Sequence, residues 1–193
     1  MKADVAGRIA ACALTVIVGL ALTGCASSPT PGSGAGPAPV PEGFQRFTES
    51  GVSFAYPAGW RIGRPPGQAA TSVVRITPPA DPPDAAESLV GFAQFEVSSS
   101  VDPEESFGAH VSEETGVYGR DLVDQGDVDV PGAPAARRFE LEYDSPEGGA
   151  RMRKLDLVVV GPDRRTLYNF YARAPVGQAA ELEPALESFR LGG

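Results

Sequence analysis

Cysteine and histidine are nearly absent from this chain. It has two cysteines, Cys12 and Cys25, and one histidine, His110. A structural zinc site takes about four such ligands, so no metal site of that kind is expected. The Gly-x-Ser-x-Gly motif of many serine hydrolases is also missing. We therefore predict a protein that is not an enzyme and has no cofactor, and a hydrolase using His110 as general base is the least favoured alternative.

Positive charge is scarce as well. The chain has 16 Lys and Arg residues against 25 Asp and Glu residues, and its formal net charge is −9. Nucleic-acid binding depends on basic side chains that neutralise phosphates, so the sequence argues against a nucleic-acid partner. We expect the acidity to favour solubility and to keep the domain away from an anionic lipid surface.

No apolar run is long enough to cross a bilayer. The uncharged segment from Ile9 to Leu22 is too short, because a membrane-spanning helix needs roughly 20 residues. It follows the basic residues Lys2 and Arg8, and a short apolar segment behind a basic start is typical of a secretory signal peptide. We predict that residues 1–24 form this signal peptide.

The apolar segment ends in "LTGC", Leu22 to Cys25. This motif resembles the bacterial lipoprotein box, and the resemblance implies a diacylglyceryl thioether on Cys25, cleavage before it and acylation, as by palmitate, of the new amino terminus. The alternative is a chance cysteine in an ordinary exported protein. Removal of Cys12 with the signal peptide leaves Cys25 as the one cysteine of the mature chain. We expect lipidation at Cys25 and a protein anchored to the extracytoplasmic face of the cell membrane.

Residues 25–43 are rich in Pro, Gly and Ser, with a single charged residue. Such a composition cannot bury a core and is typical of a flexible tether. Lys2 and Lys154 are the only lysines beside many arginines, a pattern that suggests a GC-rich genome. Together with the lipoprotein box, it points to an actinobacterium.

Residues 44–193 alternate between apolar and polar side chains, as β-strands do. Strands are predicted within residues 51–57, 72–78, 89–99, 127–132, 136–145, 153–161 and 165–174. In the hairpin through "SPEGG", pairing Asp144 with Ala150 places Glu140 opposite Lys154 and Phe139 opposite Leu155. Opposite charges and apolar pairs favour this register.

Two helices are predicted among the strands. The first begins with Asp102 as N-cap and Pro103 behind it, and ends at Gly119. The second has its regular part starting near Glu183 and presents one apolar face, formed by Leu182, Leu186 and Phe189. Hairpin-connected strands with inserted helices predict an α+β domain over residues 44–193, in which helices cover an antiparallel β-sheet.

"FTESGVSFAYPAGWRI", Phe47 to Ile62, resembles the opening strand and turn of PsbP-like domains. The final hairpin strands and the terminal helix ending in "ESFRL" fit the same pattern. With the lipoprotein box and the tether, the chain resembles the LpqN-type lipoproteins of actinobacteria. The resemblance implies an antiparallel sheet sandwiched by helices, and an envelope protein with no established catalytic residues.

The last two long strands are apolar on both faces. A half-exposed antiparallel sheet should be polar on one side, so either a helix covers the second face or an apolar groove remains for a ligand. The groove hypothesis assigns ligand binding to Leu157, Val159, Tyr168 and Phe170.

These observations predict a non-catalytic accessory protein of the cell envelope, held at the membrane by its lipid anchor. Its expected partners are an envelope lipid or glycolipid, or a membrane protein such as a transport protein. The alternative is a pure protein-interaction adaptor with a fully packed sheet and no ligand pocket.

Overall fold

The computed structural model describes residues 39–65, 72–79, 87–146 and 148–192, all within one unit of the chain, Gly34–Gly193. The predicted signal peptide, Cys25 and the tether up to residue 38 lie outside the described residues. Most of the Pro-rich loop at 78–88 does so too. The described helices and strands and both hydrophobic clusters lie between residues 44 and 191, so a chain that begins at residue 26 contains them all.

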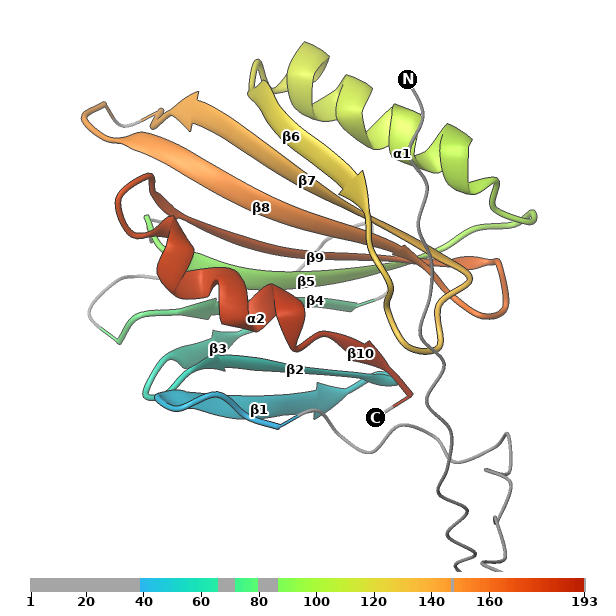
Figure 1. The fold of residues 1–193 in the computed structure, drawn as a ribbon, viewed down its shortest axis with the longest axis horizontal. Helices are drawn as coiled ribbons and strands as arrows, with labels where there is room; N and C mark the ends of the chain where they lie inside the picture. The colour runs from blue at the N-terminus through green and yellow to red at the C-terminus, as the bar shows by residue number, and fades with distance from the viewer. Residues whose placement is uncertain (1–38, 66–71, 80–86, 147, 193) are drawn as a thin grey trace, which may run out of the picture. The chain divides into compact units, whose positions relative to one another are not determined.

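The strands form two antiparallel sheets (Figure 1). The small sheet has the order β1-β2-β10, and the large sheet has the order β3-β4-β5-β9-β8-β7-β6. The small sheet contains β1 (Phe44–Glu49), β2 (Val52–Pro57) and β10 (Arg190–Leu191). The large sheet contains β3 (Arg61–Gly63), β4 (Ser72–Thr77), β5 (Leu89–Glu96), β6 (Asp121–Asp127), β7 (Ala135–Asp144), β8 (Arg151–Val160) and β9 (Thr166–Pro175).

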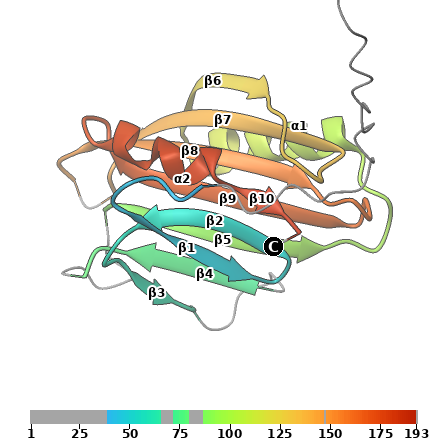
Figure 2. The ribbon, with the colours of Figure 1, turned by 60° about the horizontal axis from the view of Figure 1, so that its bottom comes forward.

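Helical segments lie on both faces of the large sheet (Figures 1 and 2). On one face lies α1 (Pro103–Ser112), which continues into the π-helical turn η1 (Glu113–Val117). The other face packs against the short helices η2 (Ala179–Leu182) and α2 (Glu183–Glu187) and against the small sheet. The predicted N-cap is confirmed, because the Asp102 side chain accepts a hydrogen bond from the Glu105 N–H at 3.0 Å.

The main core lies between the large sheet, α2 and the small sheet. Stacked and tilted aromatic rings run through it, with Phe54 and Phe170 at a centroid distance of 4.5 Å and Phe170 and Phe189 at 5.2 Å. The predicted apolar face of α2 is confirmed, since Leu182 and Leu186 are buried there. This cluster joins residues from both ends of the domain into one layer.

A second, smaller core lies under α1. Phe107 of α1 packs with Phe139 and Leu141 of β7 and with Val158 and Val160 of β8. A helix therefore covers part of the second apolar face, and the predicted sandwich of helices around an antiparallel sheet is confirmed.

The predicted register of the β7–β8 hairpin is wrong by one residue. Asp144 lies opposite Arg151, Phe139 opposite Asp156 and Glu140 opposite Leu155. Directly opposed charges do not fix this register, because the charged side chains find other partners. Glu140 pairs with Arg153 at 3.0 Å, and Asp156 faces α1. This shift brings Lys154 and Asp156 onto the same face as Phe139 and under the helix.

Candidate functional site

Four ionisable side chains meet beneath α1. Lys154 and Asp156 of β8 are 7% and 0% exposed, and Glu114 of η1 is 5% exposed. The Lys154 Nζ atom lies 2.8 Å from an oxygen of each carboxylate. His110 Nε2 lies 3.0 Å from Asp156 Oδ2, and Arg120 pairs with the second oxygen of Glu114. We call Glu114, Lys154, Asp156 and His110 the buried network.

A π-helical turn carries Glu114 into this position. Tyr118 N–H donates to the Glu113 carbonyl oxygen at 3.1 Å, five residues back rather than four. The wider turn rotates the side chains that follow, so Glu114 is buried while Tyr118 is 54% exposed. A regular helical wheel would place Tyr118 on the same face as Phe107 and Val111, but the π-helical turn ends that face before Tyr118. Regular helix periodicity gives no signal for the burial of Glu114.

Two members of the buried network, Lys154 and Asp156, have pKa values shifted from the ordinary ones. Burial by itself lowers the pKa of Lys154, but attraction to Asp156 and Glu114 outweighs it and holds that pKa above its ordinary value of 10.5. Burial likewise raises the pKa of Asp156, but Lys154 and His110 outweigh it and hold that pKa below 3.8. Lys154 and Asp156 are therefore both charged at neutral pH.

The same donors do not suit a metal ion. Ligand atoms of His110, Glu114 and Asp156 lie within 4.8 Å of one another, a separation that metal binding allows. The Lys154 ammonium already lies between the two carboxylates, and its positive charge takes the place that a cation would need. The geometry gives a structural ion-pair network rather than a metal site.

The geometry around His110 also lacks a paired nucleophile. A histidine held by a buried carboxylate resembles the base of a hydrolase triad, and Ser106 lies one helical turn earlier. Among the hydrogen bonds of the described residues, however, His110 is joined only to Asp156. Its ring also packs on Phe139, at a centroid distance of 5.0 Å. In this arrangement His110 is packed between α1 and the sheet.

A cavity of about 300 Å³ opens next to the network, between α1 and the large sheet. Its size lies at the small end of the range for ligand pockets. The Oδ1 atoms of Asn169, which lines the cavity, and of Asp156 are buried without a hydrogen-bond partner in the described structure. The helix contributes Ser106, Ala109 and His110, with Glu113 beyond its end, and the sheet contributes Phe95, Val158, Leu167, Tyr168 and Asn169.

The four residues predicted to bind a ligand lie together, but within the main core. Val159 and Phe170 are 0% exposed, Leu157 is 4% exposed and Tyr168 is 9% exposed. Tyr168 also lines the cavity under α1. Leu157 lines a second cavity of about 270 Å³, between α2 and the β6–β7 connection. Burial raises the pKa of Tyr168. Their role in ligand binding stays a prediction, as does lipidation of Cys25, which lies outside the described residues.

Comparison with known proteins finds similarity in structure but not in sequence. No protein-family model and no curated protein sequence matches the chain. The cyanobacterial PsbP (CyanoP) of Synechocystis superposes with a TM-score of 0.59 at 15% identity, covering 83% of this chain and 98% of that chain. The chain has a PsbP-like fold. The predicted α+β fold class is thereby confirmed.

Two further proteins share this PsbP-like fold. LpqN of Mycobacterium tuberculosis, a protein involved in cell envelope biogenesis, has a TM-score of 0.52 at 16% identity, with 78% of this chain and 92% of that chain covered. The Ran-binding protein Mog1p of Saccharomyces cerevisiae has a TM-score of 0.52 at 11% identity, with 77% and 95% covered. At these identities the likeness is one of fold. Among the described residues, no helix is both long and apolar enough to span a membrane.

Proposed function

We propose that this protein is a non-catalytic accessory protein of the cell envelope, anchored by lipid at Cys25 and binding an amphiphilic envelope lipid or glycolipid. The observation that carries the proposal is the "LTGC" box and Pro/Gly/Ser tether directly ahead of a PsbP-like domain. The envelope role of the similarly folded LpqN supports it. An LpqN-type role in an actinobacterium is part of the proposal.

The cavity under α1 is the place we propose for the ligand. Phe95, Leu167 and Val158 offer an apolar wall to an acyl or alkyl group. At the same cavity, His110, Glu113 and Asn169 supply polar groups for a head group, and the Asn169 Oδ1 atom has no partner within the described structure. The mixture suits a molecule with one apolar part and one hydrogen-bonding part.

This proposal keeps fewer of the four β8 and β9 residues that the sequence predicts to bind a ligand. Tyr168 lines the cavity under α1 and is retained as a ligand contact, whereas Leu157 lines the second cavity, beside α2, and is not. Val159 and Phe170 are enclosed by the main core and would meet a ligand only if that core opened. We therefore place the ligand on the α1 side of the sheet.

Native mass spectrometry of the protein purified from a mycolate-containing actinobacterial host tests the proposal. We expect one amphiphile to remain bound to the wild-type chain that begins at residue 26. Ala109 is exposed and lines the cavity, so Ala109→Trp should fill the space and remove the ligand. Ala180→Trp, at an exposed position of η2, is the matched control and should retain it.

A clean apo mass for the wild type, unchanged after addition of envelope lipid extract, would refute the lipid-binding role. It would favour the adaptor alternative, which one surface feature supports. Three large hydrophobic residues are exposed at the end of α1 and on the neighbouring edge strand, namely Val117 at 74%, Tyr118 at 54% and Val123 at 51%. Exposed apolar residues of this kind often mark a protein contact.

A further inference from the structure

The negative charge of the domain is unevenly distributed along the chain. Residues 44–79 contain four arginines and one acid, Glu49, whereas residues 96–130 contain ten acids and one arginine, Arg120. The two segments supply opposite edges of the large sheet, with β3 at one edge and β6 at the other (Figure 2). One edge of the large sheet is therefore basic, although the net charge of the chain is negative.

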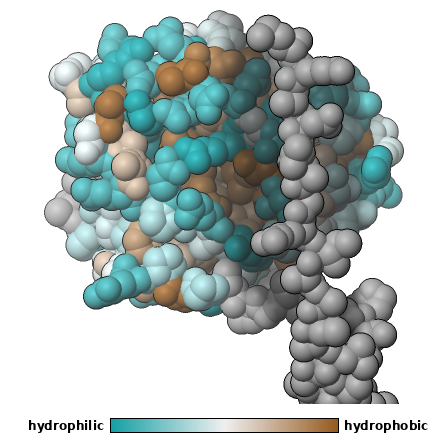
Figure 3. Space-filling view, in the orientation of Figure 1, coloured by the Kyte–Doolittle hydropathy of each residue, from teal (hydrophilic) through white to brown (hydrophobic). Residues whose placement is uncertain are grey.

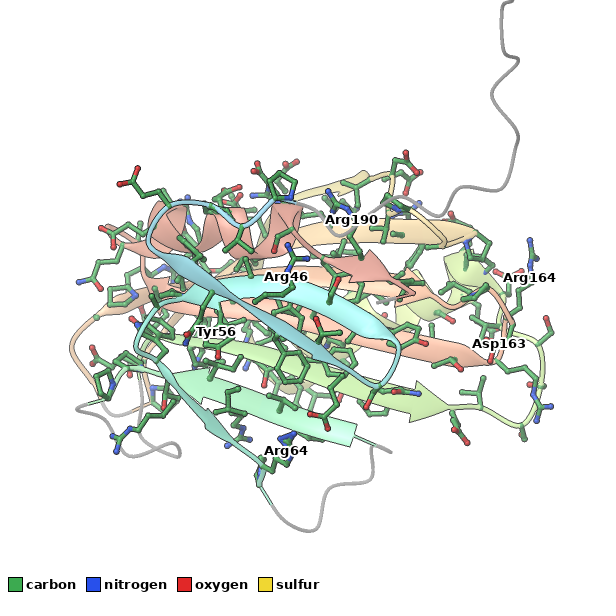
Figure 4. All side chains as sticks on the ribbon, turned by 90° about the horizontal axis from the view of Figure 1, so that it is seen from below. Arg46, Tyr56, Arg64, Asp163, Arg164 and Arg190 are labelled. Atoms are coloured by element: carbon green, nitrogen blue, oxygen red, sulfur yellow. The ribbon has the colours of Figure 1, made fainter. Side chains whose placement is uncertain are left out.

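The basic edge also exposes apolar side chains. Ile62 in the middle of β3 is 44% exposed, although its cross-strand neighbour Ile76 is fully buried. Trp60 lies directly before β3 and packs only partly against the main core. Arg64 follows β3, and Arg75 lies opposite Gly63. We call Trp60, Arg61, Ile62, Arg64 and Arg75 the β3 edge; Figure 4 labels Arg64 there.

Tryptophan, arginine and an exposed aliphatic residue form the combination that suits a membrane–water interface. The Trp ring lies at head-group level, the aliphatic group enters the outer acyl region, and arginine reaches lipid phosphates. By contrast, Figure 3 shows a largely hydrophilic surface, with hydrophobic residues between hydrophilic ones, in the view of Figure 1. The β3 edge differs from the acidic edge in the sign of its charge, although the acidic edge also exposes apolar side chains, Val117, Tyr118 and Val123.

The last residue of the predicted tether, Gly43, lies beside Ala58, whereas Pro39 and Pro41 lie near Pro184 and Arg190. The Ala58 N–H donates to the Gly43 carbonyl oxygen at 2.8 Å, and Ala58 precedes Trp60 by two residues. For the tether predicted over residues 25–43, a flexible chain of that length would have a root-mean-square span of roughly 23 Å. An anchor at Cys25 would therefore keep the domain, and with it the β3 edge, within reach of the lipid surface, where weak contacts are reinforced by high local concentration.

We infer that the β3 edge docks on the anionic lipid head groups of the membrane that carries the anchor. The inference rests on the anchoring step of the proposed function. It directs the acidic edge, with β6 at its border, away from the membrane. The expectation that acidity keeps the domain off an anionic surface then holds for that edge alone.

Vesicle binding by the unacylated chain that begins at residue 26 tests this inference. Trp60 is the only tryptophan, so its fluorescence reports contact at the proposed edge. We expect a blue shift with vesicles of phosphatidylglycerol and phosphatidylcholine, quenching by brominated lipid, and neither effect with phosphatidylcholine alone. Added salt should weaken the binding, because it screens exposed charges.

Two substitutions at the edge and two elsewhere make the test specific. Ile62→Ser and Arg64→Gln should each weaken vesicle binding by about fivefold. The matched controls are Val123→Ser, on the acidic edge strand β6, and Arg164→Gln, in the exposed β8–β9 turn (Figure 4). Both controls should bind as the wild type does.

Absence of binding to anionic vesicles, or equal losses in the edge and control variants, would overturn the inference. The lipid anchor is tested separately, because the vesicle experiment uses a chain without acyl groups. Vesicle binding by a protein whose Cys25 proves unmodified would leave the docking edge in place and remove only the anchor.

Discussion

Lys154 is the residue on which the buried network depends. Its ammonium group lies 2.8 Å from an oxygen of Asp156 and of Glu114, which are 0% and 5% exposed. Lys154→Met should leave these two buried carboxylates without the cation between them, with only His110 beside Asp156 and Arg120 beside Glu114. We expect a loss of about 3–5 kcal/mol in the free energy of unfolding, measured by urea denaturation.

Arg64→Met is the control for this substitution. Arg64 also pairs with a carboxylate, Glu49, but both side chains are about half exposed. Removal of such a surface pair should change stability by less than about 1 kcal/mol. Equal losses for the two variants would show that the buried network contributes no more than a surface ion pair.

The two shifted pKa values in the network predict how stability depends on pH. The pKa of Asp156 lies below its ordinary value, so its contribution is present above about pH 4 and is lost as pH falls through the lowered pKa. The pKa of Lys154 lies above its ordinary value, so its contribution is present below about pH 10 and is lost as pH rises through the raised pKa.

Urea midpoints measured from strongly acidic to strongly alkaline pH check this expectation. The wild type should have a plateau around neutrality that falls at both extremes. The double variant Lys154→Met/Asp156→Asn removes both groups, and its profile should fall less at each end. Parallel profiles for the two proteins would contradict the assignment of the shifts to this pair.

At the scale of single elements, most helices and strands could be predicted from the sequence. Alternation located the long strands, and the side-chain preferences of Asp102 and Pro184 located the starts of α1 and α2. These signals are local, because a cap or an alternating pattern depends on neighbours within a few residues. The N-cap of α1 is accordingly where the sequence placed it.

The buried network could not be predicted, because it joins elements far apart in the chain. Glu114 reaches Lys154 only through the π-helical turn and the one-residue shift of the β7–β8 register. Both features depend on tertiary packing: α1 and η1 bring His110 and Glu114 to Asp156 and Lys154, as partners from outside the hairpin. The cavity next to His110 depends on the same placement of α1 and left no pattern in the sequence.

The contact between β5 and β9 gives a prediction at this scale. A Cβ atom at Gly91 would lie 2.2 Å from Cζ of Tyr171, whose ring also faces the Lys154 ammonium at 5.1 Å. Gly91→Ala should therefore displace the ring and lower the free energy of unfolding, measured by urea denaturation, by about 1–3 kcal/mol. Gly126→Ala, where a Cβ meets open space, should cost much less.

The truncation Tyr171→Ala separates a steric clash from a change in strand propensity. If the ring is the obstacle, Gly91→Ala should lower the free energy of unfolding less in a Tyr171→Ala background than in the wild type. An equal loss of unfolding free energy in both backgrounds would exclude the ring contact as the cause.

For the whole molecule, the fold and the proposed cellular location rest on different parts of the chain. The PsbP-like domain lies in the described residues and is shown by packing and by structural similarity. The location rests on the "LTGC" box and the tether, whose chemistry is read from sequence. The proposed ligand cavity and the β3 edge acquire a function only if the domain works at a membrane surface.

Intact mass spectrometry of the protein extracted from membranes of its native host tests that requirement most directly. We predict a mature chain that begins at Cys25 and carries a diacylglyceryl group with added acyl mass. A Cys25→Ala variant should lack this mass and leave the membrane fraction. An unmodified chain cleaved at another residue and recovered in the soluble fraction would contradict the central claim.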